Sequence, residues 1–146
     1  MFIYFNLLFR AFIFLFLIID PIFLKGAEII ISIKNNKSDS GFIHLALYNN
    51  EEKFLEDEGK FIGLKKKTNF VVQSGISIKN LIEGDYAIAI YHDENENDNF
   101  DRLFSLPLES YGFSNNAEVF FGPPSFKESS FFLKQEEILE IEIELR

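Results

Sequence analysis

The sequence predicts an all-β protein: a single antiparallel β-sandwich of about seven strands, immunoglobulin-like or transthyretin-like, preceded by an N-terminal hydrophobic signal segment. Two observations carry this prediction. Short stretches in which apolar and polar residues alternate recur between turn residues, as expected for half-buried strands. After residue 26, no stretch keeps a helical period for more than a turn or two.

Residues 1–26 differ from the rest of the chain. Residues 11–19 form an unbroken apolar run that Asp20 and Pro21 close. A helix of that length rises about 14 Å, far short of a hydrocarbon core of about 30 Å. We therefore interpret residues 1–26 as a secretory signal peptide, with an uncleaved membrane anchor as the alternative. The predicted domain, residues 27–146, would then be exported to the periplasm, the cell envelope or the medium, touching a membrane only through an uncleaved segment.

The composition argues against three classes of protein. The chain has 14 basic and 23 acidic side chains and a formal net charge of −9, so its surface repels nucleic acid. It has no cysteine, which rules out both a disulfide-stapled domain and a lipid-modified cysteine. The 19 phenylalanines provide ample apolar area for a packed core instead.

The first predicted strands follow from alternation. In residues 28–34, isoleucines at every second position share one face. Residues 42–48 follow a polar turn and also alternate, but their second face is mixed, which suggests partial cover. The charged residues 49–60 surround Phe54 and Leu55, and we expect a surface loop or short helix that this pair holds to the sandwich.

The middle of the chain predicts three further strands. Residues 61–67 lead into a predicted strand over residues 68–73, which are rich in β-branched and aromatic side chains. A turn separates them from a predicted strand over residues 76–81. Residues 85–91 are apolar on both faces, so this strand should be central in its sheet.

The last third combines a long irregular stretch with two strands. Residues 103–128 show no sustained period and contain several prolines and glycines; long loops of this kind are often functional. Alternation resumes in residues 129–133. Residues 137–145 give the cleanest pattern, with leucines and isoleucines on one face and glutamates on the other.

An acidic loop directly after the predicted central strand carries the most specific chemical signal. Asp93, Asn95, Asn97 and Asp101 fall at relative positions 1, 3, 5 and 9. At this spacing an oxygen-lined loop can wrap a hard cation, and calcium takes six to eight oxygen ligands. The predicted Ca²⁺ ligands are Asp93, Asn95, Asn97, the Asn99 carbonyl, Asp101 and Glu109.

Other interpretations of this loop stay open. The twelfth position, where an EF-hand has a bidentate glutamate, is Phe104, so the loop is not an EF-hand. A solvated acidic hairpin whose Asx side chains cap their own backbone is the alternative. Without a counter-ion, however, Asp93, Asp98 and Asp101 would repel one another, which argues for a cation.

The two histidines of the chain allow another kind of site. His44 and His92 could face each other if their strands pair, and a His–carboxylate transition-metal site would then be conceivable. We favour a structural His92 that orients the acidic loop through a hydrogen bond.

A second cluster of polar and aromatic residues lies within residues 107–126. Its hydroxyl and amide groups could bind a carbohydrate or a protein, with aromatic rings as stacking surfaces. The candidate ligand residues are Tyr111, Phe113, Ser114, Asn115, Asn116 and Phe126. We favour the alternative that the loop packs on itself and buries its aromatic rings against the sandwich.

The chain shows no nucleophile elbow, glycine-rich phosphate loop or metalloprotease helix. We therefore expect no enzyme, no catalytic residues and no cofactor other than Ca²⁺. A hydrolase that uses Glu109, Asp101 or His92 is the remaining alternative, because any acidic pair can in principle serve acid–base chemistry.

The order of these motifs resembles a bacterial family. GDYAIAIYHDENEN at residues 84–97, Asp101, PLESYGFSNNA at residues 107–117 and GPPSF at residues 122–126 are similar to the exported proteins called the domain of unknown function 2141 family. The likeness covers about residues 28–145. It implies a periplasmic or secreted β-sandwich and carries no activity over to this chain.

The acidic loop departs from that family pattern at two positions. Asp98 stands where a glycine is usual, and Leu108 where a lysine is usual. The sixth position of such a loop often has a positive φ, which Asp tolerates better than most residues other than Gly and Asn.

Overall fold

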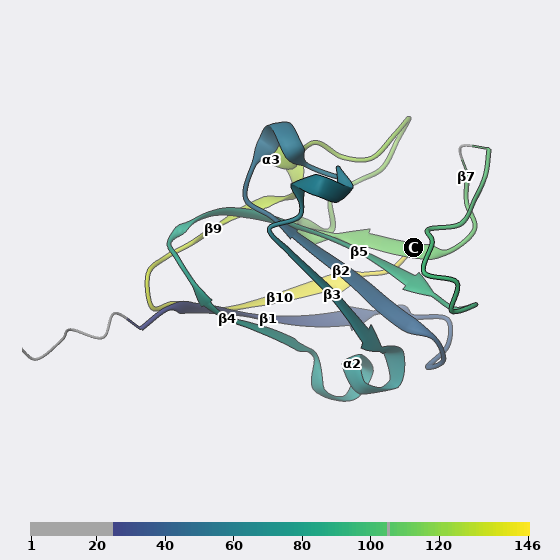
Figure 1. Ribbon diagram of the computed structural model, residues 1–146, viewed down its shortest axis with the longest axis horizontal. Helices are drawn as coiled ribbons and strands as arrows, with labels where there is room; N and C mark the ends of the chain where they lie inside the picture. Colours follow the sequence, from purple (N-terminus) through teal and green to yellow (C-terminus); the bar gives the residue numbers. More distant parts are fainter. Residues whose placement is uncertain (1–24, 105) are drawn as a thin grey trace, which may run out of the picture.

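The computed structural model of the protein describes residues 25–104 and 106–146. Two sheets pack face to face around one core (Figure 1), which confirms the all-β prediction. The predicted signal segment lies outside the described residues, except for its last two positions. Within the described residues, no helix is both long and apolar enough to cross a membrane.

The first sheet has the order β10-β1-β4. It contains β1 (Ala27–Lys34), β4 (Ile76–Leu81) and β10 (Ile138–Glu144). β1 pairs antiparallel with β4 but parallel with β10, so the antiparallel prediction is wrong for this one pair. Almost the whole domain separates β1 from β10 in sequence, so no tight hairpin imposes the antiparallel direction.

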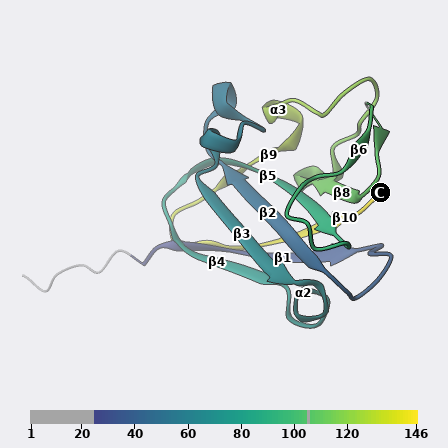
Figure 2. The ribbon, with the colours of Figure 1, turned by 45° about the vertical axis from the view of Figure 1, so that its right-hand side comes forward.

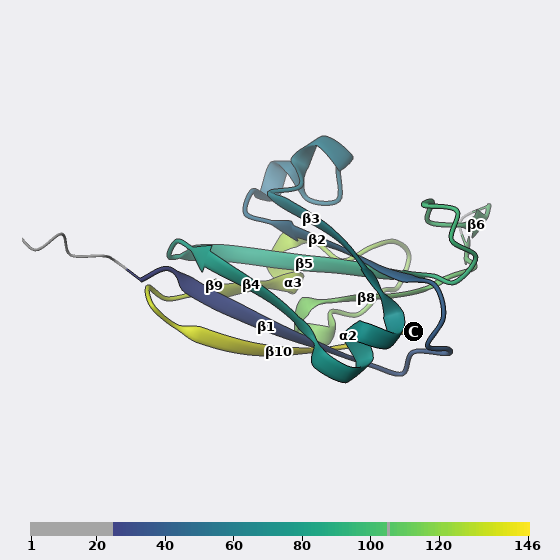
Figure 3. The ribbon, with the colours of Figure 1, turned by 60° about the horizontal axis from the view of Figure 1, so that its bottom comes forward.

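The second sheet has the order β3-β2-β5-β8, with β9 paired to the first half of β5. Its strands are β2 (Phe42–Tyr48), β3 (Ile62–Lys67), β5 (Gly84–Asp93), β8 (Ser110–Phe113) and β9 (Ser130–Leu133). β5 has β2 on one side and β8 and β9 in succession on the other, as its two apolar faces predicted. Figure 3 shows this sheet lying over the layer of β1, β4 and β10.

The core fills the space between the two layers. In β1 and β2 the inward positions are aliphatic, and in β5 two isoleucines lie between the buried Tyr86 and His92 on the inward face. The fully buried aliphatic side chains include Ile29, Ile31, Ile43, Leu47, Ile88, Leu133 and Ile143. Alternation therefore identified the inward faces correctly.

One predicted strand is a helix. The structure forms α2 (Thr68–Ser74) where the sequence predicted a strand over residues 68–73. Thr68 and Val71 are buried, whereas Phe70 is 59% exposed. Burial at every third position is the helical period, and packing of this face outweighs the β-like composition of the segment.

The charged segment between β2 and β3 forms two short 3-10 helices, η1 (Glu51–Lys53) and η2 (Asp57–Gly59). Between them, Phe54 packs edge-to-face on Tyr48, with 5.2 Å between ring centroids. The predicted attachment of this surface segment to the sandwich is thus confirmed for Phe54.

The long stretch after β5 contains more structure than predicted. Besides β8 it forms β6 (Arg102–Leu103), β7 (Leu106–Pro107), η3 (Ser114–Asn116) and α3 (Phe126–Ser129). β8 escaped prediction because four residues cannot establish a period. Figure 2 shows the β6–β7 hairpin projecting beyond the end of β5.

Candidate metal site in the acidic loop

The acidic loop, residues 93–101, leaves the C-terminal end of β5. It lies at the end of the sandwich opposite to the one where the chain enters at Lys25 (Figure 1). Asp93 is both the last residue of β5 and fully buried. The loop therefore starts from a carboxylate fixed in the body of the protein.

Asp93 organises the first half of the loop. Its Oδ1 accepts a hydrogen bond from the N–H of Asn97 at 3.1 Å, and its Oδ2 accepts one from the N–H of Asp98 at 3.0 Å. Burial raises the pKa of Asp93, but these two hydrogen bonds and the neighbouring His44 outweigh it and hold the pKa below its usual value. Asp93 is therefore ionised at neutral pH.

The turn of the loop has the conformation expected at its sixth position. Asp98 has a φ of 63°, so the aspartate adopts the left-handed conformation that a glycine usually supplies there. The aspartate at this position thus supports the turn without a glycine.

Three side chains of the loop converge at one point. The amide nitrogens Nδ2 of Asn95 and Asn97 lie 2.7 and 2.9 Å from Oδ2 of Asp101. Both amides donate to Asp101 here. Rotation of a carboxamide by 180° would present its oxygen at this point instead, at the cost of the hydrogen bond that the oxygen now accepts from a backbone N–H. Oxygen atoms about 3 Å apart are spaced like neighbouring ligands of Ca²⁺, whose bonds are 2.3–2.6 Å long.

Asx turns are present in the same loop. Asn95 Oδ1 accepts from the N–H of Asn97 at 3.1 Å, and Asn97 Oδ1 accepts from the N–H of Asn99 at 2.8 Å. The side chain of Asn99 donates to the carbonyl of Asn97 at 2.8 Å, which leaves its backbone carbonyl as the group predicted to bind the ion. The loop therefore shows both features: Asx side chains that cap its own backbone, as in the alternative interpretation, and amides that converge on Asp101.

Glu109 reaches the loop from the residue before β8. Its side chain is 9% exposed, and Oε2 accepts a hydrogen bond from the N–H of Asp101 at 3.2 Å. Oε1 is buried without a hydrogen-bond partner. Burial raises the pKa of Glu109, and the charges of Asp93 and Asp101 raise it further. The fold thus brings Glu109 and Asp101 together, as predicted.

A second group of potential ligands was not predicted. His44 Nε2 lies 3.3 Å from Asp93 Oδ2 and 3.4 Å from Asp98 Oδ1, and the three residues can place one ligand atom each within 4.8 Å of one another. Lys65 Nζ pairs with the same oxygen of Asp98 and so supplies a positive charge to the group. The pairing of β2 with β3 and β5 brings these residues together, and no local sequence pattern reveals that pairing.

The expected facing of His44 and His92 is wrong. β2 and β5 do pair, but the register places His44 opposite Tyr91 and His92 opposite Ile43. Since neighbours along a strand point to opposite faces, the two imidazoles lie on different sides of the sheet. The His44 ring stacks on Tyr91, with 4.5 Å between centroids.

His92 is fully buried at the end of the core. Its Nε2 lies 2.7 Å from the carbonyl oxygen of Ser40 and donates to it. His92 thereby ties β5 to the turn before β2, directly beneath the acidic loop. His92 is thus a structural residue, but its hydrogen bond goes to the turn before β2 and not, as we expected, to the acidic loop.

The polar groups of the second predicted cluster are used inside the protein. Ser114 is fully buried, and its Oγ accepts from the N–H of Ile88 at 2.8 Å and donates to the carbonyl of Ser129. Asn115 Nδ2 donates to a β9 carbonyl at 2.7 Å, and Asn116 Oδ1 accepts from a β10 N–H at 2.8 Å. These groups tie the loop to the strands that surround it.

The three candidate aromatic residues of this cluster also pack within the protein, whereas Phe120 and Phe121 of the same stretch are exposed. Phe113 is buried, Tyr111 packs against Phe100 with 5.8 Å between centroids, and Phe126 packs against Phe54 at 5.7 Å. The arrangement follows the self-packed alternative rather than an open stacking surface.

A family model described as "Uncharacterized protein conserved in bacteria (DUF2141)" matches residues 31–140 of the chain. This range includes the second sheet, the acidic loop, β4 and parts of β1 and β10. Comparisons with curated proteins and with solved structures find no significant match.

Proposed function

The chain belongs to the DUF2141 family, and from its acidic loop we propose that it is an exported, non-enzymatic binding or structural module whose loop at residues 93–101 binds Ca²⁺. The proposed ligands are Asp93, Asn95, Asn97, the Asn99 carbonyl, Asp101 and Glu109. The ion would fix one end of the sandwich and join the loop to β8.

The partnerless Oε1 of Glu109 is the observation that carries this proposal. A buried carboxylate oxygen without a hydrogen bond is costly unless a cation or a proton satisfies it. Glu109 lies beside Asp101, on which the amides of Asn95 and Asn97 converge. A cation at this place would neutralise both carboxylates and receive the carbonyl oxygens of both amides.

The donor set favours calcium over softer metals. Every proposed ligand is a carboxylate or carbonyl oxygen, the kind that Ca²⁺ prefers, and the chain has no cysteine. His44 lies 3.3 Å from Asp93 and 3.4 Å from Asp98, and the carboxylate of Asp98 already pairs with Lys65. A zinc-like site would have to compete with that lysine.

Two alternatives make different predictions. A purely structural domain would rely on the Asx turns and hydrogen bonds of the loop and would bind no ion. A hydrolase that uses Glu109, Asp101 or His92 gains no support from the geometry, because His92 is fully buried and its Nε2 is engaged by Ser40.

Calorimetric titration of the full chain tests the proposal, with mild nonionic detergent to keep residues 1–24 dispersed. We expect saturable binding of Ca²⁺, weaker binding of Mg²⁺, and loss of Ca²⁺ binding in Asp101→Asn. Asp85→Asn is the matched control, because Asp85 is exposed at the other end of β5 and should leave binding unchanged. Absence of saturable Ca²⁺ binding in the wild type would favour the structural alternative.

Export has a separate test. N-terminal sequencing of the protein recovered from the envelope or medium should begin near Gly26 or Ala27 if the segment is a cleaved signal. A sequence that begins at Met1 in the membrane fraction would instead identify an anchor.

A further inference from the structure

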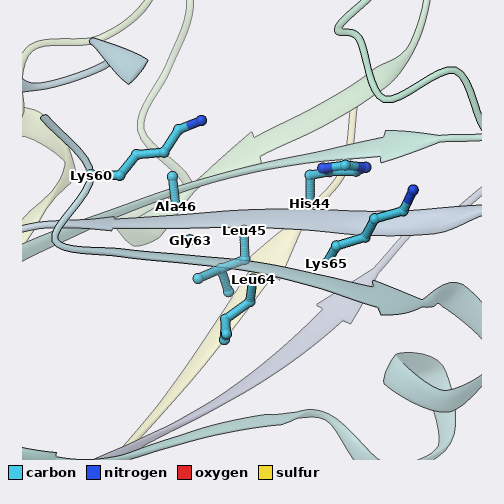
Figure 4. Close-up of a pocket in the computed structure, with 7 residues that line it drawn as sticks. All are labelled: His44, Leu45, Ala46, Lys60, Gly63, Leu64 and Lys65. Carbon is cyan, nitrogen blue, oxygen red and sulfur yellow. The ribbon is translucent and has the colours of Figure 1, made fainter. Parts of the chain in front are cut away.

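A pocket of about 230 Å³ opens on the outer face of the second sheet, over β2 and β3. Figure 4 shows the side chains of His44, Lys60 and Lys65 on one side of these strands, around Ala46 and Gly63. Its volume is below the roughly 300–1,000 Å³ of pockets for drug-sized ligands, so it suits a small group.

The pocket is the open part of an otherwise covered face. On one side Phe54 packs on Tyr48, and on the other Phe100 of the acidic loop packs on Tyr91. Between these two covers, Ala46 of β2 lies directly opposite Gly63 of β3. The floor is therefore made by two of the smallest residues of the sheet.

Gly63 has no conformational or packing reason to be glycine. Its φ is not positive, and a Cβ at this position would have Lys60 Cδ, at 3.8 Å, as its nearest neighbour. Glycine weakens a strand, and within a strand it often marks a place where a ligand or another backbone approaches. Among the described residues no other backbone would come within 4 Å of a Cβ at Gly63, and the missing side chain leaves the pocket open.

The pocket is lined by two lysines, Lys60 and Lys65, in a stretch of the chain without acidic residues. Residues 59–82 contain five lysines and no acidic residue, although the whole chain has a net charge of −9. Lysines on the edge strand β3 also discourage pairing with other chains, which accounts for residues 65–67 but not for Gly63.

Lys60 lies beside the floor of the pocket, whereas the ammonium of Lys65 lies over the Phe42 ring, 4.1 Å from its centroid, and would swing from there to meet an anion (Figure 4). Lys60 pairs with Asp57 and Lys65 with Asp98, but these aspartates are 94% and 62% exposed. Exposed ion pairs contribute little, so an anion in the pocket can replace the aspartates as partner of both ammonium groups.

We propose that the pocket over Gly63 binds a small anionic group, a carboxylate or a phosphate, held between Lys60 and Lys65 with His44 as a side wall. Both anions suit ammonium donors. The inference goes beyond the calcium proposal. None of the calcium ligands lines the pocket, but its wall His44 lies 3.3 Å from Asp93, so the anion is tested without calcium.

The test is an NMR titration of the ¹⁵N-labelled full chain in mild detergent and EDTA, with inorganic phosphate and with glucuronate as separate probes. Saturable shifts of the Gly63 and Ala46 amide signals are expected with at least one probe. Binding of phosphate alone would identify a phosphate-bearing ligand, and binding of glucuronate alone a carboxylate-bearing one.

Matched variants make the test specific. Lys60→Ala and Lys65→Ala should each weaken binding about tenfold, the usual effect of losing a charge-assisted hydrogen bond. Gly63→Val should abolish it by filling the pocket. Lys66→Ala is the charge control, because Lys66 lies opposite Ile43 and so on the other face of β3. Gly84→Val controls for adding a side chain, since a Cβ there also finds its nearest neighbour at 3.8 Å.

Two results would overturn the inference. One is that neither probe produces saturable shifts at Gly63 and Ala46. The other is that Lys66→Ala weakens binding as much as Lys65→Ala, which would show general attraction to lysines rather than a site.

Discussion

Glu109 Oε2 accepts a hydrogen bond from the backbone N–H of Asp101 at 3.2 Å, while the other oxygen of the same carboxylate is buried without a partner. The contact joins the end of the acidic loop to the residue that precedes β8. Through it, an ion bound by the loop would also fix the start of β8, which pairs with the last part of β5.

Glu109 should make stability depend on pH when calcium is removed. Its pKa in the folded protein is raised, so it stabilises the fold below its unfolded pKa, and this stabilisation is lost as the pH rises through the folded pKa. In chelator, denaturant unfolding of the full chain should therefore show stability falling with pH across that titration. Glu109→Gln should remove this part of the slope, and an unchanged slope in the variant would contradict the assignment.

Asp93 should matter whether or not calcium is bound. Asp93→Ala leaves the N–H groups of Asn97 and Asp98 without their acceptor and should destabilise the protein by about 1–3 kcal/mol even in chelator. Asp101→Asn should cost much less in chelator, because Asp101 is only partly buried. Equal losses in the two variants would show that Asp93 does not anchor the loop. Thermal unfolding in EDTA measures both.

Ser114 should be a structural residue rather than a ligand-binding one. Ser114→Ala removes the acceptor of the Ile88 N–H and the donor to the Ser129 carbonyl, both in buried surroundings. We expect a loss of about 2 kcal/mol, on the order of 5–10 °C in Tm for a domain of this size. Ser38→Ala is the control, because the Ser38 hydroxyl meets only Ser40 at the surface and should change Tm very little. A Ser114→Ala variant with the wild-type Tm would contradict this role.

Helix α2 predicts an unequal effect of neighbouring substitutions. Val71 is buried and Phe70 is 59% exposed, so Val71→Ala should destabilise by about 1–3 kcal/mol and Phe70→Ala by less than about 0.5 kcal/mol. Denaturant unfolding of both variants distinguishes the helix from the predicted strand. The reverse order of effects would contradict the helix.

Sequence patterns located the strands whose burial is regular. β1, β5 and β10 were predicted within about two residues because each has at least one strongly apolar face. The prediction for residues 68–73 was wrong because their composition favours a strand, whereas the residues that they bury, Thr68 and Val71, are three positions apart as in a helix. β8 was too short to show a period. Its Gly112 is required by a contact with β10, because a Cβ there would lie 2.7 Å from the carbonyl oxygen of Glu144.

The site was predictable to the extent that it is local. The spacing of Asn95, Asn97 and Asp101 anticipated their convergence, and the proximity of Glu109 was anticipated as well. The contacts of Asp98 with His44 and with Lys65, 33 positions away, depend on strand register. So does the pocket over Gly63, because pairing across β2 and β3 cannot be read from either strand alone.

The central claim is that a cation satisfies the buried carboxylate of Glu109. Thermal unfolding of the full chain and of Glu109→Gln, each in chelator and in millimolar Ca²⁺, tests it most directly. The account predicts that the variant is the more stable protein in chelator, because it lacks the buried unpaired charge, and the less stable one in Ca²⁺. A free Ca²⁺ concentration about 100 times the dissociation constant should raise the free energy of unfolding of the wild type by about 2.7 kcal/mol. A wild type that gains nothing from Ca²⁺, or a variant that gains as much as the wild type, would contradict it.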